Sequence, residues 1–137
     1  MSQGLLDQMG GEEGVNRLVN TFYDLMEDRP EAADLHRLHF RGHGLDHTRV
    51  QQRDFMIGFM GGRQHYRETH GHMDVRQIHE HVPIRKADAE TWLQTWDLAL
   101  RACGHSGPNI ERLRSTLRRV ATMLINDVPD WRTGEAP

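Results

Sequence analysis

Apolar residues recur at steps of three and four along four stretches of this 137-residue chain, with polar residues between them. Such spacing puts the apolar side chains on one face of an α-helix. The four predicted helices span residues 12–28, 48–60, 88–102 and 108–126. Because no stretch alternates apolar and polar residues as a half-buried strand does, the predicted fold class is all-α.

Glycine and proline divide the chain between these helices. The adjacent Gly10 and Gly11 are expected to end a short N-terminal helix, because glycine readily turns the chain. Pro30 suits the start of another short helix over residues 31–38. Residues 39–47 and 63–71 show no helical periodicity, so we predict loops there, the second one extended.

Length and composition indicate a single domain, with residues 1–10 as an N-terminal extension and 127–137 as a loose tail. The net charge of −3 at pH 7 argues against nucleic acid as a partner. Cys103 is the only cysteine, which excludes an internal disulfide and fits a reducing compartment. The chain has neither a leader pattern nor an apolar run of about 18 residues, so we expect no membrane segment and a cytoplasmic location.

Residues 71–84 are polar and carry three of the ten histidines, His72, His79 and His81. Pro83 has no N–H and disfavours helix in the residue before it, so a helix through Arg76 must end near residues 79–81. An imidazole at such a helix end faces whatever packs beyond it. Spacing alone leaves two interpretations open, a solvated loop rich in histidine and a metal ligand.

Several polar or aromatic side chains fall on the apolar faces of the predicted helices. Tyr23 lies within the apolar stripe of residues 12–28, so its ring should be buried and its hydroxyl should need a partner. Thr48 and Gln52 are one turn apart and share a face, as do Trp92 and Trp96. A core tyrosine and a surface polar pair explain these placements as well as a binding site does.

Five short motifs follow one another along the chain, and the last of them, Trp92, stands thirteen residues after His79. In order they are Gly10-Gly11; Phe22-Tyr23; Gly61-Gly62 with Tyr66; Gly71-His72 with Arg76, His79 and Pro83-Ile84; and Trp92. This order resembles the truncated haemoglobins, and within them group II, whose members place a tryptophan at the position of Trp92. The resemblance runs from Gly10 to about residue 126, and five ordered motifs with matching gaps make coincidence improbable.

The resemblance implies a truncated-globin fold, a 2-on-2 helical sandwich around haem b (iron protoporphyrin IX). It makes His79 the proximal ligand of the iron. Tyr66 and Arg76 would reach a haem propionate, the arginine through charge-assisted hydrogen bonds. The aromatic rings expected around the haem are those of Phe55, Phe59 and Trp92.

On the opposite, distal side of the haem, the resemblance makes Tyr23 and Trp92 hydrogen-bond donors to the gas ligand. A phenol O–H and an indole N–H in an apolar pocket would stabilise the negative charge that dioxygen draws from ferrous iron. The further distal positions are His39, Thr48 and Gln52. Phe40 could take the place of His39, because the loop before residue 48 is longer than in many relatives.

The chain departs from the family pattern around the proximal histidine. Arg63 stands where members usually have proline, and residues 80–82 replace a Leu-Pro-Phe-like run. His81 thereby becomes a rival ligand. Two residues at i and i+2 cannot face one point from a helix, so only one should bind iron, and the gap to Trp92 favours His79.

Three functions are compatible with these residues. The leading one is reversible binding of dioxygen and other diatomic gases at haem iron, for transport or sensing, by a monomer or homodimer. The second is an enzyme of the same fold that detoxifies nitric oxide or peroxide, with a reductase as a possible partner. The third, from another class, is a divalent-metal buffer that uses His70, His72, His79 and His81.

Overall fold

The computed structural model describes residues 4–39, 45–79 and 82–130, and every regular element in these ranges is helical. The all-α prediction is therefore confirmed. The elements are α1 (Leu5–Met9), α2 (Gly11–Asp28), the 3-10 turn η1 (Pro30–Ala32), α3 (Ala33–His39), α4 (Leu45–Phe59), α5 (His65–His70), α6 (Val75–Ile78), α7 (Lys86–Ala102) and α8 (Pro108–Leu124). No helix among the described residues is long and apolar enough to cross a membrane.

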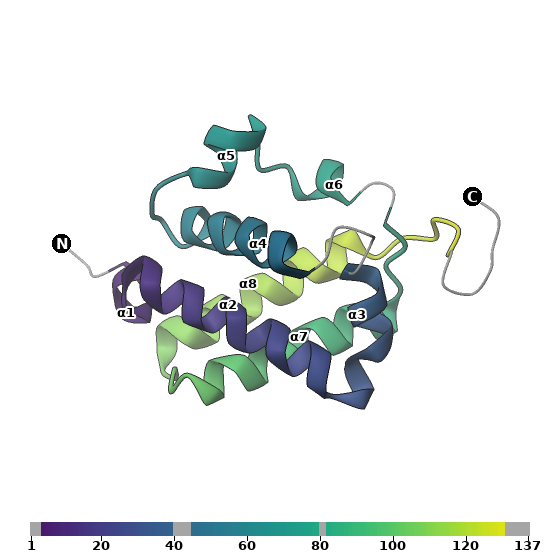
Figure 1. Ribbon diagram of the computed structural model, residues 1–137, viewed down its shortest axis with the longest axis horizontal. Helices are drawn as coiled ribbons and strands as arrows, with labels where there is room; N and C mark the ends of the chain where they lie inside the picture. The colour runs from purple at the N-terminus through teal and green to yellow at the C-terminus, as the bar shows by residue number, and fades with distance from the viewer. Residues whose placement is uncertain (1–3, 40–44, 80–81, 131–137) are drawn as a thin grey trace.

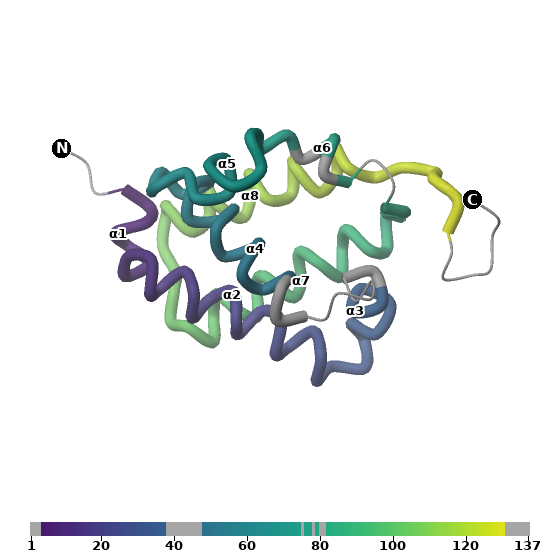
Figure 2. The backbone as a smooth tube through the Cα atoms, turned by 45° about the horizontal axis from the view of Figure 1, so that its top comes forward, coloured from purple at the N-terminus to yellow at the C-terminus, as the bar shows by residue number. Residues whose placement is uncertain are grey.

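Two helix pairs form the body of the molecule. Helix α2 packs against α4, α7 packs against α8, and the two pairs meet where α2 packs on α7. Figure 1 shows this arrangement, with α5 and α6 passing above α4, and Figure 2 shows the same elements from a second direction. The apolar stripes that predicted the helices face inward: Val15, Leu18 and Phe22 of α2 are fully buried. The predicted 2-on-2 sandwich agrees with this arrangement.

Glycines set the tight connection between α1 and α2. Gly10 and Gly11 have φ of 96° and 74°, a left-handed conformation that residues with a Cβ rarely adopt. A Cβ at Gly14 would lie 1.7 Å from the carbonyl oxygen of Met9, so only glycine lets α1 approach α2 this closely. The predicted break at Gly10 and Gly11 is confirmed, and it folds α1 back onto the start of α2.

The extended loop predicted over residues 63–71 is wrong, because residues 65–70 form α5. The segment lacks an apolar stripe, so its helix depends on contacts with other elements. The Gln64 side-chain amide donates hydrogen bonds to the carbonyls of Gly58 (3.1 Å) and Gly62 (3.2 Å), which ties the start of α5 to the end of α4. Gly71, with φ of 83°, closes the other end of the helix.

Helix boundaries also move where side chains cap the backbone. The fourth predicted helix ends at Leu124 rather than 126, because Asn126 pairs with the segment after His79 instead of continuing the helix. Its backbone N–H donates to the Ile84 carbonyl (2.8 Å), and its side-chain oxygen accepts from the Ile84 N–H (3.2 Å). Its side-chain amide donates to the Val82 carbonyl (2.9 Å).

The start of the predicted loose tail is attached to the fold. Arg85 donates to the carbonyls of Asn126 and Val128, each at 2.8 Å, and Asp130 is buried. The tail prediction is therefore wrong for residues 127–130. Its remainder, 131–137, lies outside the described residues.

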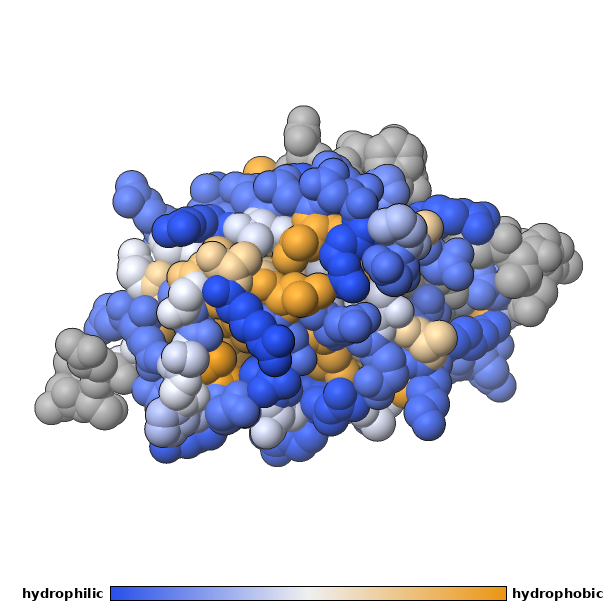
Figure 3. All heavy atoms as spheres, turned by 90° about the horizontal axis from the view of Figure 1, so that it is seen from below, coloured by the Kyte–Doolittle hydropathy of each residue, from blue (hydrophilic) through white to orange (hydrophobic). Residues whose placement is uncertain are grey.

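The face of the molecule drawn in Figure 3 is largely hydrophilic. Figure 3 shows one face, on which apolar residues gather near the middle and hydrophilic residues surround them. Three large apolar side chains of the described residues are exposed: Val50 on α4, and Met123 and Ile125 at the end of α8.

Candidate functional site

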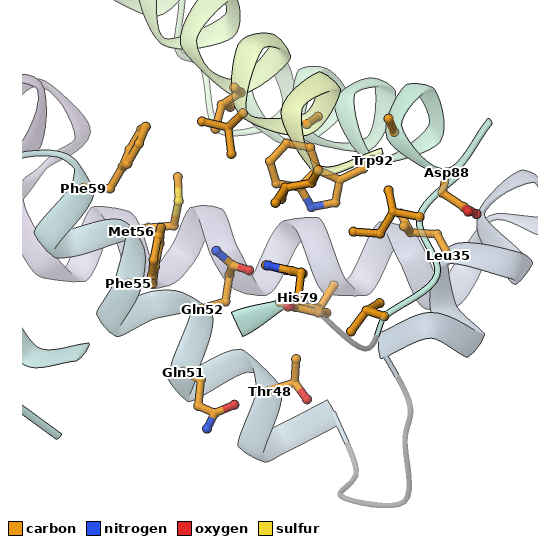
Figure 4. Close-up of a pocket in the computed structure, with 18 of the residues that line it drawn as sticks. Leu35, Thr48, Gln51, Gln52, Phe55, Met56, Phe59, His79, Asp88 and Trp92 are labelled. Atoms are coloured by element: carbon orange, nitrogen blue, oxygen red, sulfur yellow. The ribbon is translucent and has the colours of Figure 1, made fainter. Parts of the chain in front are cut away.

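A cavity of about 320 Å³ lies between the two helix pairs, within the size range of small-molecule pockets. Figure 4 shows side chains entering it from α4, from α7 and from the segment around His79. The lining is mostly apolar. The apolar residues are Leu35, Phe55, Met56, Phe59, Val82, Ile84, Ala89, Trp92, Leu117, Val120, Ala121 and Leu124.

His79 reaches the cavity from the turn after α6, where the sequence predicted that a helix must end. Its backbone N–H donates to the Arg76 carbonyl (3.2 Å), and its own carbonyl accepts from the Val82 N–H (3.0 Å). The bonds of Asn126 to Val82 and Ile84 fasten the chain just beyond this turn. The backbone that carries the imidazole is thus held on both sides.

Tyr23 enters the cavity from α2 and is completely buried. Burial raises the pKa of its phenol far above the usual value, and the positive charge of Arg49 opposes part of that rise. The hydroxyl therefore stays protonated at any physiological pH. A protonated phenol can donate a hydrogen bond into the cavity.

Helix α4 supplies Thr48 and Gln52 to the cavity, and α7 supplies Trp92. These side chains, with Tyr23 and His79, come from four separate segments of the chain. Hydroxyl, amide and indole groups are all hydrogen-bond donors. The structure therefore brings the predicted distal residues Tyr23, Thr48, Gln52 and Trp92 to the same cavity as His79.

Aromatic contacts hold the rings of Tyr23 and Trp92 in place. The ring of Phe22 lies edge-to-face with that of Tyr23, with centroids 5.1 Å apart, and stacks on Trp96 at 4.0 Å. Trp96 in turn meets Trp92 edge-to-face at 6.0 Å. The two tryptophans that shared one predicted stripe thus differ in place, since Trp92 lines the cavity whereas Trp96 belongs to the buried core.

The residues predicted to contact the edge of a haem are only partly brought together. Tyr66 lines the cavity and lies edge-to-face with Phe55, with ring centroids 5.4 Å apart. Phe59, which was predicted among the rings around the haem, also lines the cavity. Arg76 is exposed on α6 and is not among the residues that line the cavity. Its contact with a propionate therefore stays a prediction.

Three predicted or rival positions fall outside what the structure describes. The backbone of His39 ends α3, but its side chain lies outside the described part, as do Phe40 and His81. Of the other histidines, His70 is exposed and packs against the Tyr66 ring. Among the residues whose positions are described, no three His, Cys, Asp or Glu side chains form a group able to hold a metal ion between them.

Some cavity residues were not recognised as site residues from the sequence. Leu117 and Leu124 were predicted as parts of an apolar helix stripe, and nothing local distinguishes a stripe that faces a cavity from one that faces a core. Asp88 is buried at the cavity wall, where its carboxylate accepts a hydrogen bond from the Arg85 N–H (2.8 Å) at the start of α7. In the sequence, Asp88 is marked by its place three residues after Arg85, because an acidic residue at the third helical position often caps the start of a helix.

The residues at this cavity fit a flat, largely apolar cofactor held by one imidazole. Apolar and aromatic side chains form most of the wall, His79 offers the nitrogen ligand, and donors stand at other points of the same wall. No second protein ligand is needed for a haem iron that keeps a position open for a gas. The side chains that line this cavity therefore fit a haem.

Comparisons with known proteins agree with this geometry. The family model described as bacterial-like globin matches residues 4–126. The group 2 truncated hemoglobin YjbI of Bacillus subtilis (strain 168) is 30% identical over 116 residues, which are 85% of this chain and 84% of that protein. Among solved structures, the cold-adapted truncated hemoglobin of the Antarctic bacterium Pseudoalteromonas haloplanktis TAC125 has a TM-score of 0.85 at 26% identity, over 91% of this chain and 99% of that one. A truncated oxygen-avid haemoglobin from Bacillus subtilis has a TM-score of 0.79 at 30% identity, over 90% of this chain and 100% of that one.

Proposed function

Because this chain belongs to the bacterial-like globin family, and within it to the group II truncated haemoglobins, we propose that it binds dioxygen and other diatomic gases reversibly at the iron of haem b. The observation that carries the proposal is one cavity lined by His79 and by the donors Tyr23, Gln52 and Trp92. The oxygen-avid relative from Bacillus subtilis supports dioxygen as a ligand.

His79 would hold the haem iron through its imidazole, the rings of Phe55 and Phe59 would pack on the porphyrin, and Tyr66 would reach a propionate. The single cysteine, Cys103, offers no pair for covalent attachment, which favours non-covalent haem b. When bound, the haem supplies an iron centre that takes a gas ligand and transfers electron density to it.

The residues of the distal wall determine how long a gas ligand stays. Tyr23 and Trp92 donate hydrogen bonds from an apolar surrounding in which water does not compete strongly. Gln52 adds an amide that can donate from α4. A ligand that gains negative charge is retained by these donors, whereas a ligand that stays nearly neutral is not.

The divalent-metal buffer has less support than the haem function. His79 lines an apolar cavity and His70 packs against an aromatic ring, so the two do not share a polar site. We expect the protein in the cytoplasm, as a monomer or homodimer, with a reductase that keeps the iron ferrous as a possible partner.

Replacing His79 tests the proposal. The purified wild-type protein should show a strong haem absorption band near the violet edge of the visible spectrum. His79→Ala should lose stable haem binding or recover it only with free imidazole, because the variant keeps the pocket and lacks only the ligand. His81→Ala is the matched control and should bind haem like the wild type. Equal haem loss in both variants, or loss in His81→Ala alone, would contradict the assignment of His79.

A further inference from the structure

Arg49 joins α4 and α2, two of the helices that carry distal residues. It lies on α4 directly after Thr48, yet its guanidinium crosses to α2. Nη1 donates to the carbonyl and to the side-chain oxygen of Asn20, both at 3.2 Å. Nη2 donates to Oδ1 of Asp24 at 3.0 Å and lies 3.3 Å from Oε1 of Glu27. The fork-shaped guanidinium thus contacts three residues of α2 at once.

These three partners surround Tyr23 in the sequence of α2, three residues before it, one after it and four after it. The guanidinium carbon of Arg49 lies 5.6 Å from the centroid of the Tyr23 ring, within the range of a cation–π contact. The Arg49 side chain is only 17% exposed, so the contact is partly shielded from water. The guanidinium of Arg49 and the ring of Tyr23 therefore lie together where α2 contacts α4.

The bonding pattern fixes position more than it adds charge. The carboxylates of Asp24 and Glu27 offset part of the cost of burying the guanidinium. A planar guanidinium with several donors in fixed directions also sets the distance and the rotation between the two helices, which the flexible ammonium of lysine does not. Because Thr48 and Gln52 stand on the same helix as Arg49, this contact also sets where they lie relative to Tyr23.

We propose that Arg49 is a positioning residue of the distal site, which clamps α4 to α2 across Tyr23 so that the phenol, Thr48 and Gln52 face one gas ligand. The inference rests on the proposed gas-binding function. Arg49 touches neither ligand nor haem in this role, since it is not part of the cavity wall, and it acts through Tyr23 and α4. Its positive charge also lowers the pKa of the phenol against the larger effect of burial, which strengthens the phenol as a donor.

Two substitutions of Arg49 and one matched control test the clamp in the haem-loaded protein. Arg49→Met removes the charge and the fork but keeps an apolar stem, and Arg49→Lys keeps the charge while losing the fork. Arg53→Met is the control, because Arg53 lies one turn further on α4, pairs with its neighbour Asp54 and does not line the cavity. Dioxygen should leave Arg49→Met about 3- to 10-fold faster than wild type, with Arg49→Lys between them, since a misplaced donor loses part of its hydrogen bond.

Carbon monoxide release and a double substitution separate positioning from general loosening. Carbon monoxide gains little negative charge, so its release should change less than about twofold in every variant. Adding Arg49→Met to Tyr23→Phe should speed dioxygen release by a smaller factor than Arg49→Met does alone, because part of the clamp's effect passes through the phenol and only the part through Thr48 and Gln52 remains. An effect of Arg49→Met in that background as large as its effect in the wild type would overturn the proposal.

Fluorine NMR adds a readout that does not depend on gas binding. Tyr23 and Tyr66 are the only tyrosines, so 3-fluorotyrosine labelling gives two signals, which Tyr66→Phe assigns. Arg49→Met should shift the Tyr23 signal and leave that of Tyr66 in place, whereas Arg53→Met should move neither. An unshifted Tyr23 signal would overturn the clamp even if the protein binds dioxygen as proposed. A shifted signal with unchanged dioxygen release would show that Arg49 is structural only. Unchanged release in Tyr23→Phe itself would overturn both the distal role of Tyr23 and the clamp.

Discussion

Replacing Tyr23 with phenylalanine removes one oxygen atom from the distal wall and little else. The ring is fully buried and keeps its edge-to-face contact with Phe22, so Tyr23→Phe should leave the packing of α2 intact. The change therefore isolates the hydrogen bond that the phenol donates. Trp92→Phe makes the equivalent change on α7, although it also shortens the ring.

The expected magnitude follows from the chemistry of the donor. A neutral hydrogen bond contributes about 0.5–1.5 kcal/mol, and one to a partly anionic acceptor roughly twice that. Since about 1.4 kcal/mol corresponds to a factor of ten, dioxygen should leave each single variant roughly 2- to 100-fold faster. The two changes should be non-additive, because Gln52, on the same cavity wall, can replace a missing donor.

Stopped-flow measurement of dioxygen and carbon monoxide release checks this prediction. Carbon monoxide release should change far less in both variants, and a changed binding rate would report access past the ring. Unchanged dioxygen release in both Tyr23→Phe and Trp92→Phe would refute the reasoning and make Thr48, Gln52 or His39 the controlling residues.

Two further predictions concern stability. The haem-free protein should melt on the order of 10 °C below the haem-loaded form, because Phe55, Phe59 and Trp92 otherwise border an empty cavity and a ligand of the native state stabilises it by mass action. Equal calorimetric melting temperatures would argue against a central haem pocket. The second prediction concerns pH. Burial raises the pKa of Tyr23 in the folded protein above its unfolded value of about 10. The stability that the protonated phenol contributes is therefore complete below a pH of about 10 and is lost as the pH rises above that value. Urea unfolding of Tyr23→Phe should consequently be less sensitive to pH between about 9.5 and 11 than that of wild type, and equal sensitivity would contradict the burial argument.

The sequence by itself determined the helices that are marked by a regular spacing of apolar residues. The apolar periodicity of residues 12–28, 88–102 and 108–126 predicted α2, α7 and α8 to within two residues at each end. Such periodicity is sufficient because a helix with one apolar face buries it against any apolar neighbour. Gly10, Gly11 and Pro83 marked chain breaks for equally local reasons, since each restricts or frees its own backbone.

For the candidate site, the sequence predicted members but not their surroundings. The gap between His79 and Trp92 and the motif Phe22-Tyr23 pointed to three residues that the structure brings to one cavity, His79, Trp92 and Tyr23. The separate places of Trp92 and Trp96 could not be predicted, because one turn of helix puts both on the same stripe. Only the packing of α7 against α2 decides which ring stacks on Phe22.

The tertiary structure alone decided the features that join distant segments. Helix α5 has no apolar stripe and depends on the bonds of Gln64 to the end of α4. Asn126 ends α8 because it pairs with Val82 and Ile84, more than forty residues earlier in the chain. Arg49 reads in sequence as one charged residue of a polar helix face, and its role depends on a contact with α2. The bonds of Asn126 and Arg49 link residues far apart in sequence, so they exist only once the helices have packed, and no local pattern of residues encodes them.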